Sequence, residues 1–403
     1  MRPALEVADI LRAHGAAYQA DHRVSAEQAA VMRHLVICRT AAMGGHVDAC
    51  DQCGFQRVSY NSCRDRHCPK CQAAKRAQWV EQRLARLLPV PYFHVVFTLP
   101  EQLKPLVLRN RRRVYELLFR AASATLLQLA ADPKRLGAQI GLTAVLHTWS
   151  QNLLFHPHLH CVVTGGGLTA DGDHWVAARE GYLLPVKVMA RLFRGKFLHG
   201  LQQLYETGEL SFAGSTESLN DPRAFAALRN QLYRQDWIVY AKPPFGGADH
   251  VYRYLGRYTH RVAIANSRLI AMEGDRVRFH WKDYAHGNQV RHMTLSAEEF
   301  IRRFLLHVLP KRFVRIRHYG LMAGRNVDTR LARCRALLKN AAEPSSAPSP
   351  SAAPTLPGDE QDWGTCPRCR GALRRRELPA GRAVLRLASA SAMAWPVETL
   401  DSS

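Results

Sequence analysis

The residues best suited to carry out chemistry are three histidines at alternate positions. They are His156, His158 and His160, separated by Pro157 and Leu159. In a β-strand, residues two apart project from the same face, so His158 and His160 would point together while Leu159 is buried on the other side. Two imidazoles on one rigid strand form half of a shell for a divalent metal ion. A chain with 19 histidines can carry such a run by accident, but the regular spacing in an otherwise apolar strand favours metal binding.

A metal ion held by two histidines needs at least a third ligand. The nearest candidates are His156, Gln151 and Asn152, and the sequence does not choose among them. His156 has the same parity as the other two histidines. Pro157, however, predicts that the strand begins only near this point, because proline cannot donate a hydrogen bond to a neighbouring strand.

Two tyrosines form a second group with possible chemistry. Tyr254 and Tyr258 are four residues apart in a helix predicted over 250–259, so they are adjacent on one helix face. Arg257 and Arg261 are interleaved with them and offer phosphate contacts. A phenol has a pKa of about 10 and is a poor nucleophile unless a metal ion polarises the phosphate. The alternative is a pair of core aromatic residues, and only the histidines favour the chemical interpretation.

Paired cysteines predict a structural zinc site. Cys50 and Cys53 form one pair, and Cys68 and Cys71 form a second pair after fourteen intervening residues. Each pair can present two thiolates to one tetrahedral Zn²⁺, and four protein ligands leave no open position for catalysis. In a reducing compartment, such clusters are more often metal sites than disulfides. We therefore expect one structural Zn²⁺ bound by these four cysteines.

Other residues of the same segment leave the ligand set open. Cys63, His67 and His46 could complete a second site, or Cys63 and His67 could join the first cysteine pair instead of the second pair. Near the C-terminus, Cys366 and Cys369 form only half of a site. This half site is either a remnant or finds its partners elsewhere in the chain.

The composition indicates a nucleic-acid partner. The chain of 403 residues has 56 Lys and Arg against 33 Asp and Glu, a net charge of +23, which attracts phosphate polyanions. A generally basic protein is the alternative. No apolar stretch approaches the roughly 18–20 residues that span a bilayer, and the first residues lack the layout of a signal peptide. We therefore expect a cytoplasmic protein with no membrane partner.

The predicted elements favour an α+β fold, because strands and helices are mixed over about 90–325 without regular alternation. Strands are predicted at 92–98, 142–149, 158–164 and 237–241, with a hairpin at 268–272 and 276–284. Helices are predicted within 5–45 and at 73–88, 102–131, 187–206, 222–235, 250–259 and, after the cap residue Ser296, 300–306. Residues 46–76 are predicted to contain little regular structure.

Several segments together resemble the two-tyrosine insertion-sequence transposases, the rolling-circle enzymes of the insertion sequence 91 group and of common-region elements. The run Ser-Cys-Arg-Asp-Arg-His-Cys-Pro-Lys-Cys-Gln at 62–72, after the first cysteine pair, resembles the N-terminal zinc-binding domain of that family. Further similar segments occur in the family's order at 91–100, 147–160, 254–261 and 313–320. The resemblance covers about residues 20–325, and the combination is far more specific than any single segment.

The resemblance implies a histidine–hydrophobe–histidine (HUH) nuclease domain, an antiparallel sheet flanked by helices with the histidines on a central strand. His158 and His160 would hold Mg²⁺ or Mn²⁺, and Tyr254 and Tyr258 would be the nucleophiles. One tyrosine would attack single-stranded DNA at the element ends or the target. This attack would leave a 5′-phosphotyrosine and a free 3′-hydroxyl, which is later resolved by that hydroxyl or by the second tyrosine. The protein would act on bacterial DNA in the cytoplasm.

This organisation predicts four segments. Residues 1–88 form a helical and zinc-binding, DNA-contacting domain, and 89–335 form the HUH catalytic domain. Residues 336–362 form a linker rich in Pro, Ser and Ala, and 363–403 form a basic tail with half a zinc knuckle. The side chains expected at the DNA are Arg64, Arg66, Lys70, Arg257, Arg261, Arg315 and Arg317.

Two other functions stay open at this point. A non-catalytic DNA-binding protein would use only the zinc module and the basic surface, whereas a metal hydrolase would use the histidines to activate water. The sequence after Arg370 is rich in Ala and Arg and does not complete a second cysteine knuckle. This departure from the family pattern puts a C-terminal zinc site in question.

Overall fold

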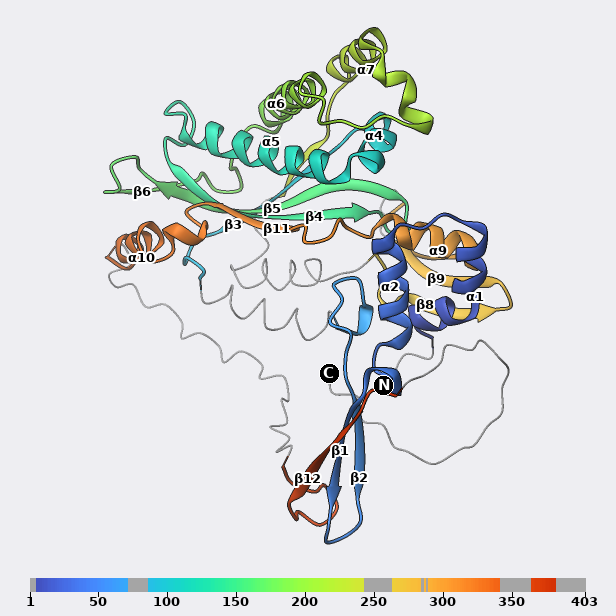
Figure 1. The fold of residues 1–403 in the computed structure, drawn as a ribbon. Coiled ribbons are helices and arrows are strands. Elements are labelled where there is room, and N and C mark those ends of the chain that lie inside the picture. Colours follow the sequence, from blue (N-terminus) through green and yellow to red (C-terminus); the bar gives the residue numbers. More distant parts are fainter. Residues whose placement is uncertain are drawn as a thin grey trace.

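The computed structural model describes residues 5–71, 86–242, 263–283, 286–287, 289–340 and 364–381. Three antiparallel sheets form the framework of this part of the chain. They are a central sheet of six strands, a three-stranded meander and a three-stranded ribbon (Figure 1). The helix predicted at 250–259 lies outside the described residues, as do 73–85 of the helix predicted at 73–88.

The central sheet has the strand order β11-β4-β5-β3-β7, with β6 beside β5. Every strand pair in it is antiparallel, and the two longest strands, β4 and β5, lie side by side in the middle. β-branched and aromatic residues are frequent in these strands, in keeping with their preference for a pleated surface. The strands are β3 (Tyr92–Thr98), β4 (Gln139–Trp149), β5 (Phe155–Leu168), β6 (Trp175–Ala177), β7 (Val239–Lys242) and β11 (Ile316–Gly320).

One face of the central sheet is covered by helices stacked above it (Figure 1). They are α4 (Lys104–Arg109), α5 (Arg111–Ala131), α6 (Val186–Glu206) and α7 (Pro222–Arg234). Phe97, Leu146 and Leu159 point into the apolar core on this side. Because side chains alternate along a strand, this burial turns the histidines of β4 and β5 to the opposite face. Leu159 is fully buried, as the alternation predicts.

A second unit packs against the N-terminal helices. It consists of the meander β8 (Leu269–Glu273), β9 (Arg276–Asp283) and β10 (Gln289–Ser296), followed by α9 (Ala297–Leu306). Gly274, at a φ of +58°, begins the two-residue turn of the predicted hairpin. Ser296 caps α9 by accepting a hydrogen bond from the backbone N–H of Glu299. The helices α1 (Val7–Asp21) and α2 (Ala26–Ile37) share one apolar core with this unit.

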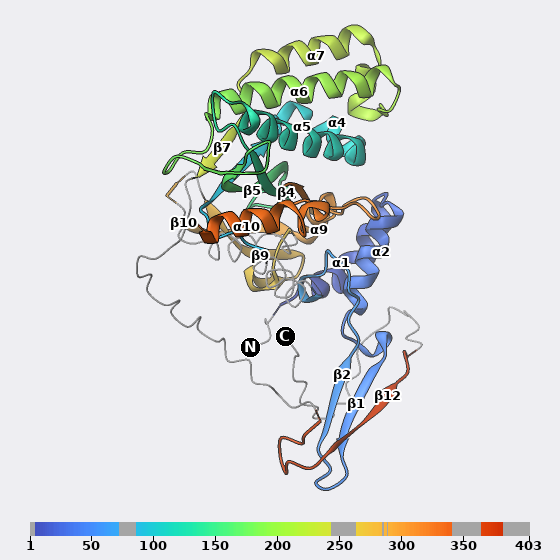
Figure 2. The ribbon, with the colours of Figure 1, turned by 90° about the vertical axis from the view of Figure 1, so that its left-hand side faces the viewer.

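The ribbon contradicts the expectation of little regular structure over 46–76. In it, β1 (Gly45–Cys50) pairs with β2 (Gln56–Tyr60) on one side and with β12 (Leu373–Leu378) on the other. Both views show it extending away from the rest of the molecule (Figures 1 and 2). The apolar alternation is interrupted by Asp48, which is buried because Arg57 and Arg375 form ion pairs with it.

The α+β class and the antiparallel sheet flanked by helices are confirmed. Strand β5 begins earlier than predicted. The pairing of β4 with β5 is irregular between the pairs Trp149–Phe155 and His147–His158, and Pro157 lies at this irregularity. A proline is tolerated there because no hydrogen bond between the strands is lost. Residues 336–340, predicted as linker, belong to α10 (Arg330–Asn340). Among the described residues no helix is long and apolar enough to cross a membrane.

Candidate metal centre and zinc-binding module

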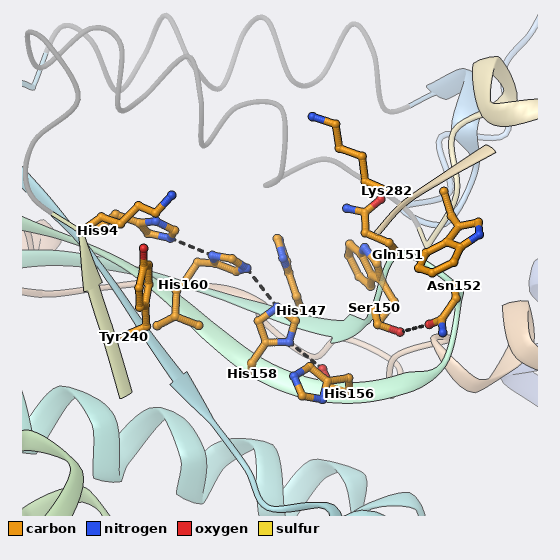
Figure 3. A pocket seen from close by; sticks show the side chains of 14 residues that line it. His94, His147, Ser150, Gln151, Asn152, His156, His158, His160, Tyr240 and Lys282 are labelled. Carbon is orange, nitrogen blue, oxygen red and sulfur yellow. Dashed lines mark hydrogen bonds between the residues drawn. The ribbon is translucent and has the colours of Figure 1, made fainter. Parts of the chain in front are cut away.

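Three imidazoles from two neighbouring strands converge on the face of the central sheet opposite helices α4 to α7 (Figure 3). His158 and His160 lie on β5, and His147 lies on β4 directly opposite His158. One nitrogen of each ring lies within 4.8 Å of the others, and the Nε2 atoms of His158 and His160 are 3.0 Å apart. Two ligands about 2.1 Å from an octahedral ion and at right angles would be about 3.0 Å apart. The spacing therefore fits a single bound ion.

Hydrogen bonds at the outer ring nitrogens orient these imidazoles. Nδ1 of His158 donates to the backbone carbonyl of His156 at 2.6 Å, which leaves the lone pair on Nε2. Nδ1 of His160 lies 2.8 Å from Nε2 of His94 on β3, and these two rings are stacked with their centroids 5.0 Å apart. A proton on Nδ1 of His160 would likewise free its Nε2 for an ion. Metal-binding histidines are generally held by outer partners of this kind.

Burial keeps these histidines neutral. Desolvation lowers the pKa of His158 and of His94 to about 4, and it holds the pKa of His160 well below its ordinary value. Neutral imidazole is the form that binds metal ions. Three nitrogen ligands suit a transition-metal ion such as Mn²⁺ better than Mg²⁺, which prefers carboxylate and water oxygens. The residues present thus fit a divalent ion, and of the two predicted ions they fit Mn²⁺ better.

The histidines form one wall of a cavity of about 510 Å³. The other described residues that line it include two lysines, Lys242 and Lys282, but no acidic side chain. A cavity with this charge attracts anionic groups such as phosphate. Its remaining lining residues are His94, Val96, Trp149, Ser150, Gln151, Asn152, His156, Tyr240 and Trp281.

The third imidazole differs from the candidates that the sequence offered. His147 joins the pair, whereas His156 contributes its carbonyl to His158, and its ring is outside the three-histidine group. Gln151 and Asn152 lie on the cavity wall (Figure 3). His147 belongs to a correctly predicted strand, but its position opposite His158 depends on the register of two strands, which local sequence does not reveal.

The tyrosines Tyr254 and Tyr258 and the arginines Arg257 and Arg261 lie outside the described residues. The predicted convergence of phenols and imidazoles therefore stays a prediction. Of the predicted imidazoles and phenols, the described residues include the imidazoles.

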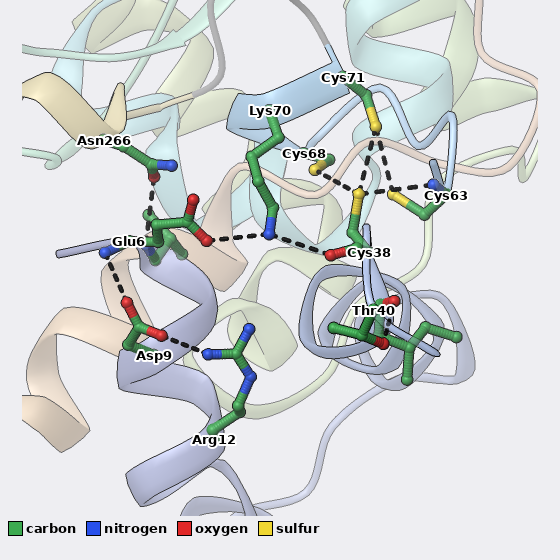
Figure 4. Close-up of polar contacts among 12 residues, drawn as sticks. Glu6, Asp9, Arg12, Cys38, Thr40, Cys63, Cys68, Lys70, Cys71 and Asn266 are labelled. Carbon is green, nitrogen blue, oxygen red and sulfur yellow. Dashed lines mark hydrogen bonds and ion pairs between the residues drawn. The ribbon is translucent and has the colours of Figure 1, made fainter. Parts of the chain in front are cut away.

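Four cysteines near the N-terminal helices form a compact cluster (Figure 4). Cys38 at the end of α2 has its Sγ 3.5 Å from that of Cys71 and 3.6 Å from that of Cys68, and Cys63 lies 3.6 Å from Cys71. Four thiolates about 2.3 Å from a tetrahedral Zn²⁺ would be about 3.8 Å apart. The backbone N–H of Cys63 points at the sulfur of Cys38, and the side-chain hydrogen bond with Cys63 is the main cause that lowers the pKa of Cys38 to about 7.

This cluster corrects the predicted grouping of the cysteines. Cys68 and Cys71 are joined by Cys38 and Cys63, whereas Cys50 and Cys53 lie with Cys366 and Cys369 in a separate group. The prediction combined the two pairs that are nearest in sequence, and it missed Cys38 because that residue stands alone at a helix end.

His67 is not a member of either cysteine group. Its Nδ1 donates to Asp65 at 3.0 Å, and its Nε2 accepts from the backbone N–H of Leu309 at 3.1 Å. Both ring nitrogens are therefore occupied. These bonds connect the cysteine cluster to the chain that follows α9, so His67 has a structural role here.

Most of the described side chains that were expected at the DNA make internal contacts. Arg66 donates to the backbone carbonyls of Pro310 and Phe313, and Lys70 pairs with Glu6 at 2.9 Å. Arg315 is buried, and Arg317 lies over the ring of Phe119 at 4.4 Å from its centroid. Only Arg64 of this described group is exposed. These cationic side chains therefore stabilise contacts within the protein itself.

Comparisons with known proteins agree with this architecture. A family model described as "Transposase zinc-binding domain" matches residues 10–99, and one described as "Putative transposase" matches residues 141–330. The first range contains the cluster of Cys38 and its partners, and the second contains the three histidines. The fold and these matches define a transposase with an N-terminal zinc-binding domain.

Two relatives cover most of the chain. A protein of Sinorhizobium fredii named "Putative transposase y4qJ" is 53% identical over 371 residues, which are 90% of this chain and 92% of that protein. The transposase for insertion sequence element IS801 of Pseudomonas savastanoi pv. phaseolicola is 30% identical over 72% of this chain and 69% of that protein. The chain belongs to the insertion sequence 91 family of transposases, and it is therefore a DNA-processing enzyme.

Among solved structures, the conjugative relaxase TrwC in complex with oriT DNA, in its metal-bound form, matches 41% of this chain and 70% of the relaxase. The sequence identity is 14% and the TM-score is 0.23. A metal-free structure of the same relaxase matches at a TM-score of 0.22. A likeness of this degree is too distant to assign any residue's role.

Proposed function

We propose that this transposase cleaves and rejoins single-stranded DNA through a covalent 5′-phosphotyrosine, formed by Tyr254 or Tyr258, at a divalent ion bound by His147, His158 and His160. The convergence of three imidazoles in a cavity with two lysines is the observation that carries the proposal. The family membership supports DNA as the substrate. The ion is Mn²⁺ or Mg²⁺, and the donor set favours Mn²⁺.

When bound, the ion polarises a scissile phosphate and stabilises the charge that develops on it. The chain's own residues do the rest. His94 and the carbonyl of His156 hold the imidazoles in place, and Lys242 and Lys282 attract the DNA backbone into the cavity. Trp149 and Trp281 offer aromatic surfaces on which unpaired bases could stack, an interaction that single strands provide and duplexes do not.

The covalent step conserves the energy of the broken bond. The phenol oxygen forms a bond to phosphorus, the bond from phosphorus to the 3′-oxygen breaks, and the phenol proton ends on that 3′-oxygen. The DNA is then attached by its 5′-phosphate to the tyrosine. Attack by a free 3′-hydroxyl reverses the exchange and joins strands without nucleotide hydrolysis. The second tyrosine can accept another strand end by the same chemistry. Such an enzyme would act on bacterial DNA in the cytoplasm.

A denaturing gel with labelled oligonucleotides that span the element ends tests the proposal. With Mn²⁺, we expect a DNA band shifted by the mass of the protein, and chelator should abolish it. The double substitution Tyr254→Phe with Tyr258→Phe should remove the shifted band and leave DNA binding nearly unchanged. Tyr233→Phe, at an exposed tyrosine on α7, is the matched control and should retain the band.

The same gel separates the proposal from its rivals. A hydrolase that activates water would yield shorter DNA without a protein adduct, and a non-catalytic binding protein would yield neither. Cleavage that persists in the double tyrosine variant would disprove the nucleophile assignment. His147→Ala should suppress cleavage in the wild-type tyrosine background, since it removes one of the three imidazoles.

A further inference from the structure

Cysteines from the two ends of the chain meet at the tip of the ribbon. The sulfur of Cys50 lies 3.4 Å from that of Cys369, and the sulfur of Cys53 lies 3.5 Å from that of Cys366. All four sulfurs lie within 4.8 Å of one another. Sulfurs in a disulfide would be about 2.05 Å apart, whereas those around one tetrahedral Zn²⁺ would be about 3.8 Å apart. The spacing therefore fits one ion.

The two cysteine pairs have the same local backbone structure. In the first, the N–H of Cys50 donates to the carbonyl of Phe55, and the N–H of Gly54 donates back to the carbonyl of Cys50. In the second, the N–H of Cys366 donates to Gly371 and the N–H of Arg370 donates back to Cys366.

In both pairs, the residue four positions after the first cysteine has a positive φ, +70° at Gly54 and +61° at Arg370. A non-glycine residue rarely adopts this conformation. Its recurrence at the equivalent position shows that the C-terminal pair forms a complete knuckle, like the N-terminal pair.

Contacts beside the cysteines hold the two knuckles together. Strand β12 pairs with β1 over six residues, from Gly45 opposite Leu378 to Cys50 opposite Leu373. The guanidinium of Arg368 lies 5.6 Å from the centroid of the Phe55 ring. At the middle of the ribbon, the buried carboxylate of Asp48 accepts a hydrogen bond from Arg375 at 2.8 Å.

We propose that Cys50, Cys53, Cys366 and Cys369 bind a second structural Zn²⁺, which fastens the C-terminal segment 364–381 to the N-terminal zinc module. Four thiolates close the coordination shell, so this ion has no catalytic position. Cys366 and Cys369 lie outside both ranges that the family models match. The zinc-binding module is therefore assembled from both ends of the chain, which are 313–319 residues apart at these contacts.

Zinc content measures the site directly. The full-length protein, purified under reducing conditions, is compared by mass spectrometric metal analysis with Cys366→Ser/Cys369→Ser. Cys334→Ser, at a buried cysteine outside both clusters, is the matched control. We expect the double variant to lose one Zn²⁺ per chain and the control to lose none. Equal zinc content in the wild type and the double variant would overturn the proposal.

A second experiment does not depend on stoichiometry. A protease site is inserted into the Pro- and Ser-rich sequence at 341–358, and the chain is cut after folding. The two pieces should elute together from a sizing column and separate after a zinc chelator is added. In the Cys366→Ser/Cys369→Ser protein they should separate at once, while the zinc of the other cluster is retained. Pieces that remain together after zinc is removed would contradict the proposed fastening role.

Discussion

Replacing His94 by phenylalanine removes one hydrogen bond behind the metal centre and preserves an aromatic ring in its place. In the wild type, Nε2 of His94 lies 2.8 Å from Nδ1 of His160, and His94 is only 4% exposed. This hydrogen bond keeps the proton of His160 on Nδ1, so the lone pair on Nε2 is left for the ion. His94→Phe should therefore weaken ion binding without removing a ligand.

Two estimates agree on the size of the effect. Loss of an outer partner of a metal-binding histidine typically lowers metal affinity by about 10–100-fold, which corresponds to roughly 1.4–2.7 kcal/mol. A hydrogen bond lost from a buried polar group costs about 1–3 kcal/mol. Because His94 is buried, we expect the Kd for Mn²⁺ to rise toward the upper part of this range.

Isothermal titration calorimetry with Mn²⁺ measures this change. His318→Phe is the matched control, since His318 lies in the same sheet and is hydrogen-bonded to Thr143 at 2.9 Å, away from the three-histidine group. His94→Gln offers an amide oxygen to the same bond and should recover part of the affinity. If His94→Phe changes the Kd by less than about twofold, or no more than His318→Phe does, then the hydrogen bond between His94 and His160 does not support ion binding.

Three further predictions concern the core between the central sheet and its helices, the wall of the cavity and the zinc module. Leu159→Ala should lower the free energy of unfolding by about 2–5 kcal/mol in urea titrations, because this fully buried side chain lies in the core beneath α5; a loss below about 1 kcal/mol would contradict its placement. Lys282→Ala should weaken single-stranded DNA binding for every sequence and reduce the salt dependence by about one counterion, which binding isotherms at several salt concentrations measure. Arg66→Ala should instead lower the unfolding free energy by about 1.5–3 kcal/mol, because Arg66 bonds to the carbonyls of Pro310 and Phe313. An unchanged thermal stability with a reduced salt dependence would show that Arg66 contacts DNA after all.

The histidine face could be predicted from the sequence, but the complete histidine group could not. His158 and His160 flank an apolar residue in a β-branched segment, and the alternation of a strand places both on one face. His147 joins them only because β4 pairs with β5 in one particular register. A slip of one residue would turn it to the other face, and that register is set by the packing of both strands against α5.

The grouping of the cysteines likewise depends on contacts between residues that are far apart in the sequence. Two-residue spacing identifies each knuckle, because it depends on a local turn. It does not identify which knuckles share an ion, and the nearest pairs along the chain turned out to belong to different clusters. The sequence does not predict strands β1 and β2, because Asp48 and Arg57 within them are charged and yet buried, which hides the usual alternation of apolar and polar residues.

Peptide mapping of the covalent complex tests the central claim most directly. The protein is incubated with Mn²⁺ and a single-stranded oligonucleotide, the bound DNA is trimmed with nuclease, and tryptic peptides are sequenced by tandem mass spectrometry. We predict a nucleotide mass on Tyr254 or Tyr258, absent when chelator is present and absent in His158→Ala. A nucleotide attached to any other residue, or cleaved DNA with no modified peptide, would contradict the account.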